Sequence, residues 1–228
     1  TMAMASALLL FPFYWQGVRG FSAQTAGVLL LPLAGTFMLA APVAGLLSDR
    51  WGARIIGSVG LGIVAVGMFL LSGVGVDTPI WSVLLRLVVL GMGMGMFMAP
   101  NNNAVMSAVP PQRRGIASGL LGTTRYLGQT IGITFAGTLF AVFATSGGFR
   151  LGQEGLPGPD TINRLASDPE AYAAVQMAFV NGMSGVFLVC IPLALIGVTL
   201  SWMRGKPVAD DGRVTSEEAA TEPAQRGP

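Results

Sequence analysis

Two arginines inside long apolar runs, Arg86 and Arg125, are the residues best suited to chemistry in this sequence. A guanidinium keeps its charge and costs about 2.5–3.5 kcal/mol at the centre of a membrane helix, so each should face a polar interior. Three amides, Asn101, Asn102 and Asn103, follow in the same apolar run as Arg86, and Gln129 lies one turn after Arg125. Together these side chains predict a polar cavity between helices. The structural alternative is that Arg86 reaches the outer interface of a bilayer and Arg125 bonds helix carbonyls.

Methionine and aromatic side chains could add an adaptable apolar surface to such a cavity. Met94 and Met98 are four residues apart and therefore share one face of a helix, and methionine adapts to varied apolar ligands. Tyr14, from an aromatic cluster near the start of the chain, is a further candidate. The alternative for the methionines is contact with lipid or the filling of gaps between helices.

Residues needed for other kinds of chemistry are missing. The sequence has no histidine and a single cysteine, Cys190, so the commonest metal ligand, the commonest general base and an internal disulfide are all excluded. Asp49 and Asp77 fall at turns, and the other acids fall in an outer loop or a tail. We expect no metal site, no cofactor and no enzymatic activity, and these spans offer no acid that could carry a proton.

A short charged turn, residues 45–54, separates two long apolar runs. Gly45 should let the end of one helix approach a neighbour closely, and Gly52 permits a tight reversal of the chain. Asp49 and Arg50 lie where helix ends meet lipid head groups, and Arg54 follows the reversal. The plain interpretation is a basic hairpin turn that only sets orientation in the membrane.

The elements that must position these residues are membrane helices. Hydrophobic residues make up 52% of the chain and charged residues only 11%, against about 25% charged in ordinary soluble domains. We predict an all-α integral membrane bundle of six helices in one domain, residues 1–206, with an external loop at 146–172 and a disordered cytoplasmic tail at 207–228. The spans are expected at about 2–16, 25–48, 55–74, 79–109, 115–145 and 173–203.

Small residues predict where these helices come closest. Gly91, Gly95 and Ala99 repeat at four-residue intervals, so they form one helical face on which another helix can approach backbone to backbone. The third span is rich in glycine and is also expected to pack tightly.

Basic residues predict the orientation of the bundle. Lysines and arginines are more numerous in the turns on the side of Arg50, Arg54, Arg113 and Arg114 than on the other side. That side is therefore expected to be cytoplasmic, with both termini in the cytoplasm. The arginines are spread over short turns rather than gathered in one patch, so a nucleic-acid partner is not expected.

Several of these motifs resemble the major facilitator superfamily. The turn Gly-x-Leu-small-Asp-Arg-x-Gly-x-Arg, residues 45–54, resembles its signature loop between the second and third helices of each half. Arg86 with the glycines at 91, 93 and 95 is similar to its arginine-and-glycine motif in the fourth helix. Segments 98–111, 114–119 and 125–128 look most like the carboxy-terminal half of the fourteen-helix drug:proton antiporters.

The resemblance implies one half of a major facilitator fold in the bacterial plasma (inner) membrane. Such a protein would export small hydrophobic or cationic drugs by proton-driven alternating access, with the substrate held between two halves. Protons would be carried by the complementary half. The expected substrate-cavity residues are Arg125, Gln129, Asn101, Asn102, Met94, Met98, Tyr14 and Arg86. The expected conformational latch consists of Gly45, Asp49, Arg50, Gly52 and Arg54.

The first predicted span, about 2–16, is shorter than the ~20 residues needed to cross a bilayer. We therefore expect a chain that begins partway along a helix and is inactive without a second six-helix half. The rival hypothesis is a self-contained six-helix membrane protein that forms a homodimer or acts as a non-transporting partner.

Overall fold

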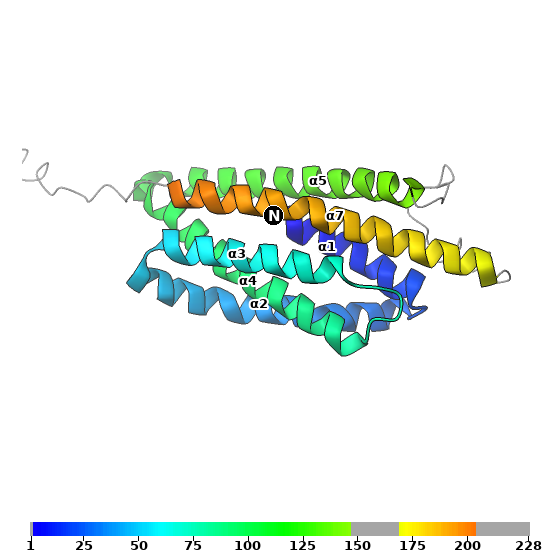
Figure 1. The fold of residues 1–228 in the computed structure, drawn as a ribbon. Coiled ribbons are helices and arrows are strands. Elements are labelled where there is room, and N and C mark those ends of the chain that lie inside the picture. The colour runs from blue at the N-terminus through cyan, green and yellow to red at the C-terminus, as the bar shows by residue number, and fades with distance from the viewer. Residues whose placement is uncertain (1, 147–168, 204–228) are drawn as a thin grey trace, which may run out of the picture.

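The computed structural model describes residues 2–146 and 169–203, and every regular element within them is a helix. In chain order they are α1 (Met2–Phe13), the π-helical segment η1 (Tyr14–Val18), α2 (Ala23–Trp51), α3 (Ala53–Ser72), α4 (Ile80–Ser107), the short 3-10 segment η2 (Pro111–Arg113), α5 (Arg114–Ser146) and α7 (Pro169–Met203). The long helices run side by side in an elongated bundle (Figure 1). This confirms the predicted all-α bundle.

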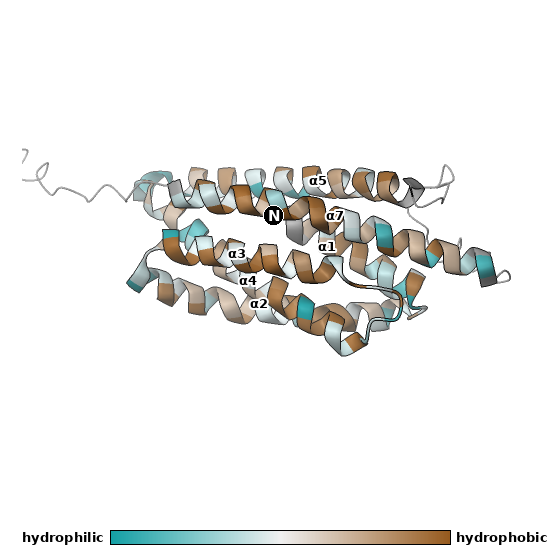
Figure 2. Ribbon diagram, in the orientation of Figure 1, coloured by the Kyte–Doolittle hydropathy of each residue, from teal (hydrophilic) through white to brown (hydrophobic). Residues whose placement is uncertain are grey.

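Five described helices, α2, α3, α4, α5 and α7, are long and apolar enough to cross a membrane. Apolar residues run along most of their length, and hydrophilic residues gather near their ends (Figure 2). Large apolar side chains also point outward: Met38 and Leu39 of α2 are 76% and 71% exposed. A surface this apolar is suited to lipid rather than water. These are the features of a multi-pass membrane protein.

Some helix boundaries differ from the predicted spans. α2 begins at Ala23 rather than 25 because Ser22 caps it, with the Thr25 N–H donating to Ser22 Oγ at 3.3 Å. It ends at Trp51 rather than 48. α7 begins at Pro169, so residues 169–172 are helical and not part of the predicted external loop. The remainder of that loop, 147–168, and the predicted tail, 207–228, lie outside the described residues.

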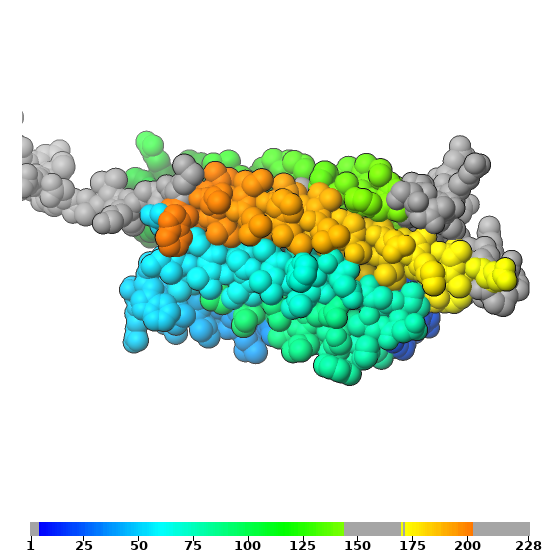
Figure 3. Space-filling model, viewed as in Figure 1, coloured from blue at the N-terminus to red at the C-terminus, as the bar shows by residue number. Residues whose placement is uncertain are grey.

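The helices form two groups that meet along α3 and α7. α4 packs most extensively on α2 and α3, whereas α5 packs on α7 and α1. α7 lies along α3 and joins the two groups (Figure 3). We call the end of the bundle that carries Gly52 and the last turn of α7 the Gly52 end. The opposite end, with the loop at 73–79, is the Gly75 end.

The close contact between α2 and α4 depends on glycine, as the sequence predicted. A Cβ added at Gly95 would lie 2.7 Å from the Phe37 carbonyl oxygen, and one at Gly91 would collide with the Leu33 carbonyl. No larger residue fits at either position without moving the backbone. The predicted close approach of this face is confirmed for Gly91 and Gly95.

α4 meets α3 through a second set of glycines. A Cβ at Gly60 would lie 2.6 Å from the Phe97 backbone nitrogen, and one at Gly93 would lie 2.7 Å from the Val64 nitrogen. The prediction that the third span packs tightly is confirmed here. Gly62 differs, because nothing lies within 4 Å of its added Cβ.

α1 and η1 pack by their aromatic side chains near the Gly75 end. Phe11, Tyr14 and Trp15 are fully buried, and Phe11 stacks on Phe187 of α7 with ring centroids 6.0 Å apart. The π-helical turn places the Arg19 N–H on the Tyr14 carbonyl at 3.1 Å. The buried indole N–H of Trp15 has no partner within the described part of the chain, and we have no physical account of it.

Candidate functional site

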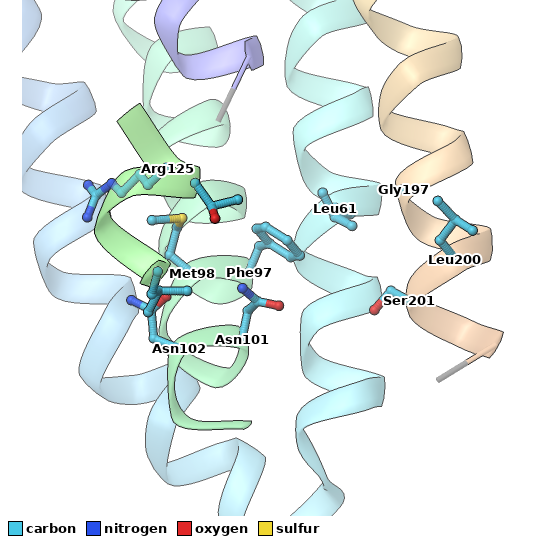
Figure 4. Close-up of a pocket in the computed structure, with 11 residues that line it drawn as sticks. Leu61, Phe97, Met98, Asn101, Asn102, Arg125, Gly197, Leu200 and Ser201 are labelled. Carbon is cyan, nitrogen blue, oxygen red and sulfur yellow. The ribbon is translucent and has the colours of Figure 1, made fainter. Parts of the chain in front are cut away.

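A cavity of about 450 Å³ lies among four helices, in the half of the bundle nearer the Gly52 end (Figure 4). Its volume falls within the range of about 300–1,000 Å³ that is usual for small-molecule sites. It is lined by Leu61 of α3; Phe97, Met98, Asn101 and Asn102 of α4; Leu121, Thr124 and Arg125 of α5; and Gly197, Leu200 and Ser201 of α7.

Helical spacing explains why these residues share one cavity. Side chains three or four positions apart lie on one helix face, as Leu121, Thr124 and Arg125 do on α5. The same spacing relates Met98 to Asn102 on α4. α4 is held against α2 and α3 by its glycines, so its cavity-facing residues have a fixed position.

The cavity has a more polar end and a more apolar end. Arg125 and Asn102 lie at the polar end with Met98 between them, and Leu61, Gly197, Leu200 and the hydroxyl of Ser201 lie at the apolar end (Figure 4). No carboxylate is present among the lining residues. The arrangement can hold a small molecule that is polar at one end and apolar at the other.

Four of the eight predicted cavity residues line this space: Arg125, Asn101, Asn102 and Met98. Arg125 is exposed, and the two asparagines are half-buried. Gln129 lies one turn beyond Arg125 and is half-buried, but it is not among the lining residues. Its substrate role remains a prediction.

Met94, Tyr14 and Arg86 lie outside the cavity. Met94 is 2% exposed and belongs to the apolar core. Tyr14 is fully buried and donates its hydroxyl proton to the Gly75 carbonyl at 2.9 Å. Arg86 donates from Nη1 to the Leu70 carbonyl at 2.7 Å, which agrees with the structural alternative of a position near one end of the bundle.

The residues of the cavity that the sequence reasoning missed are mostly apolar. Phe97 and Thr124 adjoin Met98 and Arg125 in the sequence, so helical spacing could have suggested them. Leu61, Leu200 and Ser201 come from α3 and α7, and nothing in their local sequence indicates that these helices meet α4 and α5. Ser58 of α3 donates its hydroxyl to Ser201 at 3.2 Å beside the cavity.

The predicted latch residues lie at the Gly52 end, but largely within helices. Gly45, Asp49 and Arg50 belong to the last turns of α2, and only Gly52 separates α2 from α3. Gly52 has φ +85° and ψ 143°, a conformation that L side chains avoid, and its N–H donates to the Ser48 carbonyl at 2.8 Å. The predicted tight reversal at Gly52 is confirmed.

Two details of the latch differ from expectation. No atom of the described residues lies within 4 Å of a Cβ added at Gly45, so the close helix approach predicted for this glycine is not made with the described helices. Arg54 lies with its guanidinium carbon 5.0 Å from the centre of the Trp202 ring in α7. Asp49 and Arg50 are exposed, and the latch role of these residues remains a prediction.

Comparison with known proteins gives the family. The sequence matches the Major Facilitator Superfamily over residues 1–133, a stretch that includes the Gly52 turn and the cavity residues of α3, α4 and α5. The chain belongs to the major facilitator superfamily. As a member of this superfamily, the chain is related to membrane transporters. Nothing in the described residues indicates catalysis.

Its relatives are longer transporters. The chain is 36% identical over 145 residues to the uncharacterized transporter YebQ of Escherichia coli (strain K12), covering 64% of this chain and 32% of YebQ. It is 33% identical over 138 residues to the riboflavin transporter RibZ of Clostridioides difficile (strain 630), and the match covers 60% of this chain and 30% of RibZ. It is 26% identical over 219 residues to the tetracenomycin C resistance and export protein of Streptomyces glaucescens, and the match covers 87% of this chain and 41% of that protein. The chain spans about a third of the length of these relatives.

Proposed function

We propose that this chain is one six-helix half of a transporter that exports hydrophobic compounds, cationic ones among them, by proton-driven alternating access. The observation that carries the proposal is the cavity among membrane helices, where Arg125, Asn101 and Asn102 meet apolar side chains. Ligand sites commonly combine an apolar lining with a few polar groups. The superfamily match and a relative named for resistance and export support this direction.

A glycine-rich face on α5 supports the need for a complementary half. A Cβ added at Gly115, Gly119, Gly122 or Gly137 would meet nothing within 4 Å, unlike the glycines of α4. Small residues on membrane helices serve close packing with another helix. Because the matched stretches cover only 30–41% of the relatives' length, we assign this face to contact with a second six-helix half. A second copy of the chain, forming a homodimer, is the alternative.

Proton coupling is assigned to the complementary half. The acids among the described residues are Asp49, Asp77 and Glu170. They lie near the end of α2, in the loop at 73–79 and in the first turn of α7, and so none lies midway along a helix. A proton pathway through a bilayer needs titratable groups at membrane depth.

The Gly52 end is proposed to face the cytoplasm of a bacterial cell, with both termini on that side. Arg50, Arg54, Arg113 and Arg114 lie at this end, whereas Arg19 lies at the Gly75 end. An excess of basic residues in short turns favours the cytoplasmic side. Fusing a reporter active only in the cytoplasm at the loop 73–79 should give no signal, and a signal there would reverse the orientation.

Efflux from cells tests the transport proposal. A fluorescent lipophilic cation and an uncharged hydrophobic dye are loaded into cells that express this chain alone, or together with the amino-terminal half of a related exporter. We expect efflux of at least one dye only when both halves are present. Efflux by this chain alone would favour the homodimer, and no efflux in either case, with both halves inserted, would contradict the proposal.

The latch is tested in the same cells. Replacing Asp49→Asn should slow efflux while leaving dye binding largely unchanged, because the charge acts on the conformational change and not on the ligand. Asp77→Asn is the matched control, since Asp77 is also exposed but lies at the opposite end. Equal efflux by the Asp49 variant and the control would remove Asp49 from the latch.

A further inference from the structure

We propose that the cavity in this chain binds the anionic head group of a single-tailed amphiphile, with the tail at its apolar end, and excludes cations of the same size. This inference rests on the proposed function, because it names the class of ligand for the same cavity. For a substrate that carries a cationic group, it follows that this group is bound by the complementary half and not here.

The positive charge of the cavity is not neutralised by the described part of this chain. Arg125 has neither a hydrogen bond nor an ion pair with any described residue. The described acids, Asp49, Asp77 and Glu170, are outside the lining. A carboxylate or sulfate can form paired hydrogen bonds with the guanidinium, whereas an ammonium group would be repelled by it.

Two further lining residues carry neutral donors. Asn102, at the same end as Arg125 in Figure 4, offers an amide group. Thr124, which precedes Arg125 in α5, offers a hydroxyl. Amides and hydroxyls can donate to an anion or accept from a cation, so they strengthen head-group binding without selecting its sign. Selection between anion and cation therefore falls to Arg125.

The opposite end accepts a tail. Leu61 and Leu200 supply apolar surface there, and Leu61 lies close against Gly197, since a Cβ added at Gly197 would lie 3.3 Å from Leu61 Cδ1. A cavity of about 450 Å³ is near the lower limit for a drug-sized ligand, so one tail fits better than the two of a phospholipid.

Binding to the purified full chain in nanodiscs of zwitterionic lipid provides the test. Dodecanoate and dodecyltrimethylammonium, which share a tail but differ in the sign of the head group, compete with a fluorescent fatty acid. Empty nanodiscs give the background from partitioning. We expect dodecanoate to compete at least ~10-fold more strongly than the ammonium compound.

Changes at Arg125 separate charge from packing. Arg125→Gln should weaken dodecanoate binding by ~10-fold to ~100-fold and leave the ammonium compound little changed. Arg125→Glu should reverse the order of the two ligands. The matched control is Arg113→Gln, which removes an exposed arginine of η2 outside the lining and should leave both affinities as in the wild type.

A change at the apolar end tests the position of the tail. Leu200→Asn should weaken both ligands by a similar factor, because both carry the same tail. Leu195→Asn is the control, since Leu195 is also exposed on α7 but does not line the cavity. Equal effects of these two substitutions would overturn the assignment of the tail.

The source of the anion is resolved by adding anionic phospholipid to the nanodiscs. Loss of dodecanoate competition in these discs would identify the occupant as lipid and overturn the single-tail assignment, whereas unchanged competition supports a free amphiphile. Equal affinity for the two dodecyl ligands, or retained preference in Arg125→Gln, would overturn the inference even if the cells export dye. Anion-selective binding without export would instead contradict only the proposed function.

Discussion

The guanidinium of Arg54 lies 5.0 Å from the centre of the Trp202 ring, and this contact joins the first turn of α3 to the last turn of α7. One turn further in, the Ser58 hydroxyl bonds the Ser201 hydroxyl at 3.2 Å between the same two helices. The two contacts hold α3 and α7 together at the Gly52 end of the cavity. Arg54 is thus engaged inside its own bundle, whereas the sequence suggested only a role in the latch.

Removing either partner of this cation–π contact should loosen the junction of α3 and α7. Arg54→Gln and Trp202→Leu are each expected to lower the apparent unfolding temperature in detergent. The loss in free energy of unfolding in the double variant should be smaller than the sum of the two single losses, by about 0.5–1 kcal/mol. Strict additivity would mean that the two side chains do not interact, and Arg50→Gln serves as a control arginine at the same end.

The glycine contact between α3 and α4 predicts a sharp difference between neighbouring positions. Gly60→Ala should lower the free energy of unfolding by about 1–3 kcal/mol, because its methyl group would meet the Phe97 backbone nitrogen at 2.6 Å. Gly62→Ala should be neutral or stabilising by up to ~1 kcal/mol, since its Cβ meets nothing and alanine favours helix. Similar unfolding temperatures for the two variants would contradict the close contact of α3 with α4.

The backbone at Gly52 predicts another stability difference. Gly52→Ala should cost about 1–3 kcal/mol, because the residue has φ +85° with ψ 143°, a region open almost only to glycine. Gly35→Ala, also in an open environment but within α2, is the control and should not destabilise. Thermal unfolding in detergent compares the two, and a stable Gly52→Ala protein would rule out this backbone conformation.

Tyr14 is expected to hold the loop at 73–79 rather than a ligand. Tyr14→Phe keeps the ring but removes the hydroxyl that donates to the Gly75 carbonyl, so it should cost about 0.5–1.5 kcal/mol and increase hydrogen exchange in that loop. Tyr126→Phe changes a tyrosine that is 71% exposed and should alter neither. Unchanged exchange in Tyr14→Phe would contradict the role of this hydroxyl in holding the loop.

Local periodicity accounts for what the sequence could predict. Gly91 and Gly95 are four residues apart, so they must share one face of their helix. That shared face was enough to predict a close contact with another helix, which proves to be α2. Likewise the reversal at Gly52 required only a glycine between two apolar runs. The family resemblance rested on short motifs of this kind, and the match over residues 1–133 bears out the superfamily.

Contacts between distant helices were beyond such reasoning. The partner of the Tyr14 hydroxyl is 61 residues away, and no local pattern distinguishes this tyrosine from one that lines a cavity. Gly45 resembles the packing glycines in its surroundings of apolar residues, yet a Cβ added there would meet no described atom within 4 Å. The cavity residues that α7 supplies, Gly197, Leu200 and Ser201, could not be predicted for the same reason.

The two glycine faces of α4 also determine how the cavity can change shape. A helix whose backbone touches α2 on one side and α3 on another cannot rotate about its own axis or slide, because either motion would drive carbonyl oxygens into alpha carbons. Helices α2, α3 and α4 are therefore expected to move together as one rigid body. Widening of the cavity is then left to α5 and α7, which supply the rest of its lining, so the arginine at its polar end is expected to move while the asparagines stay still.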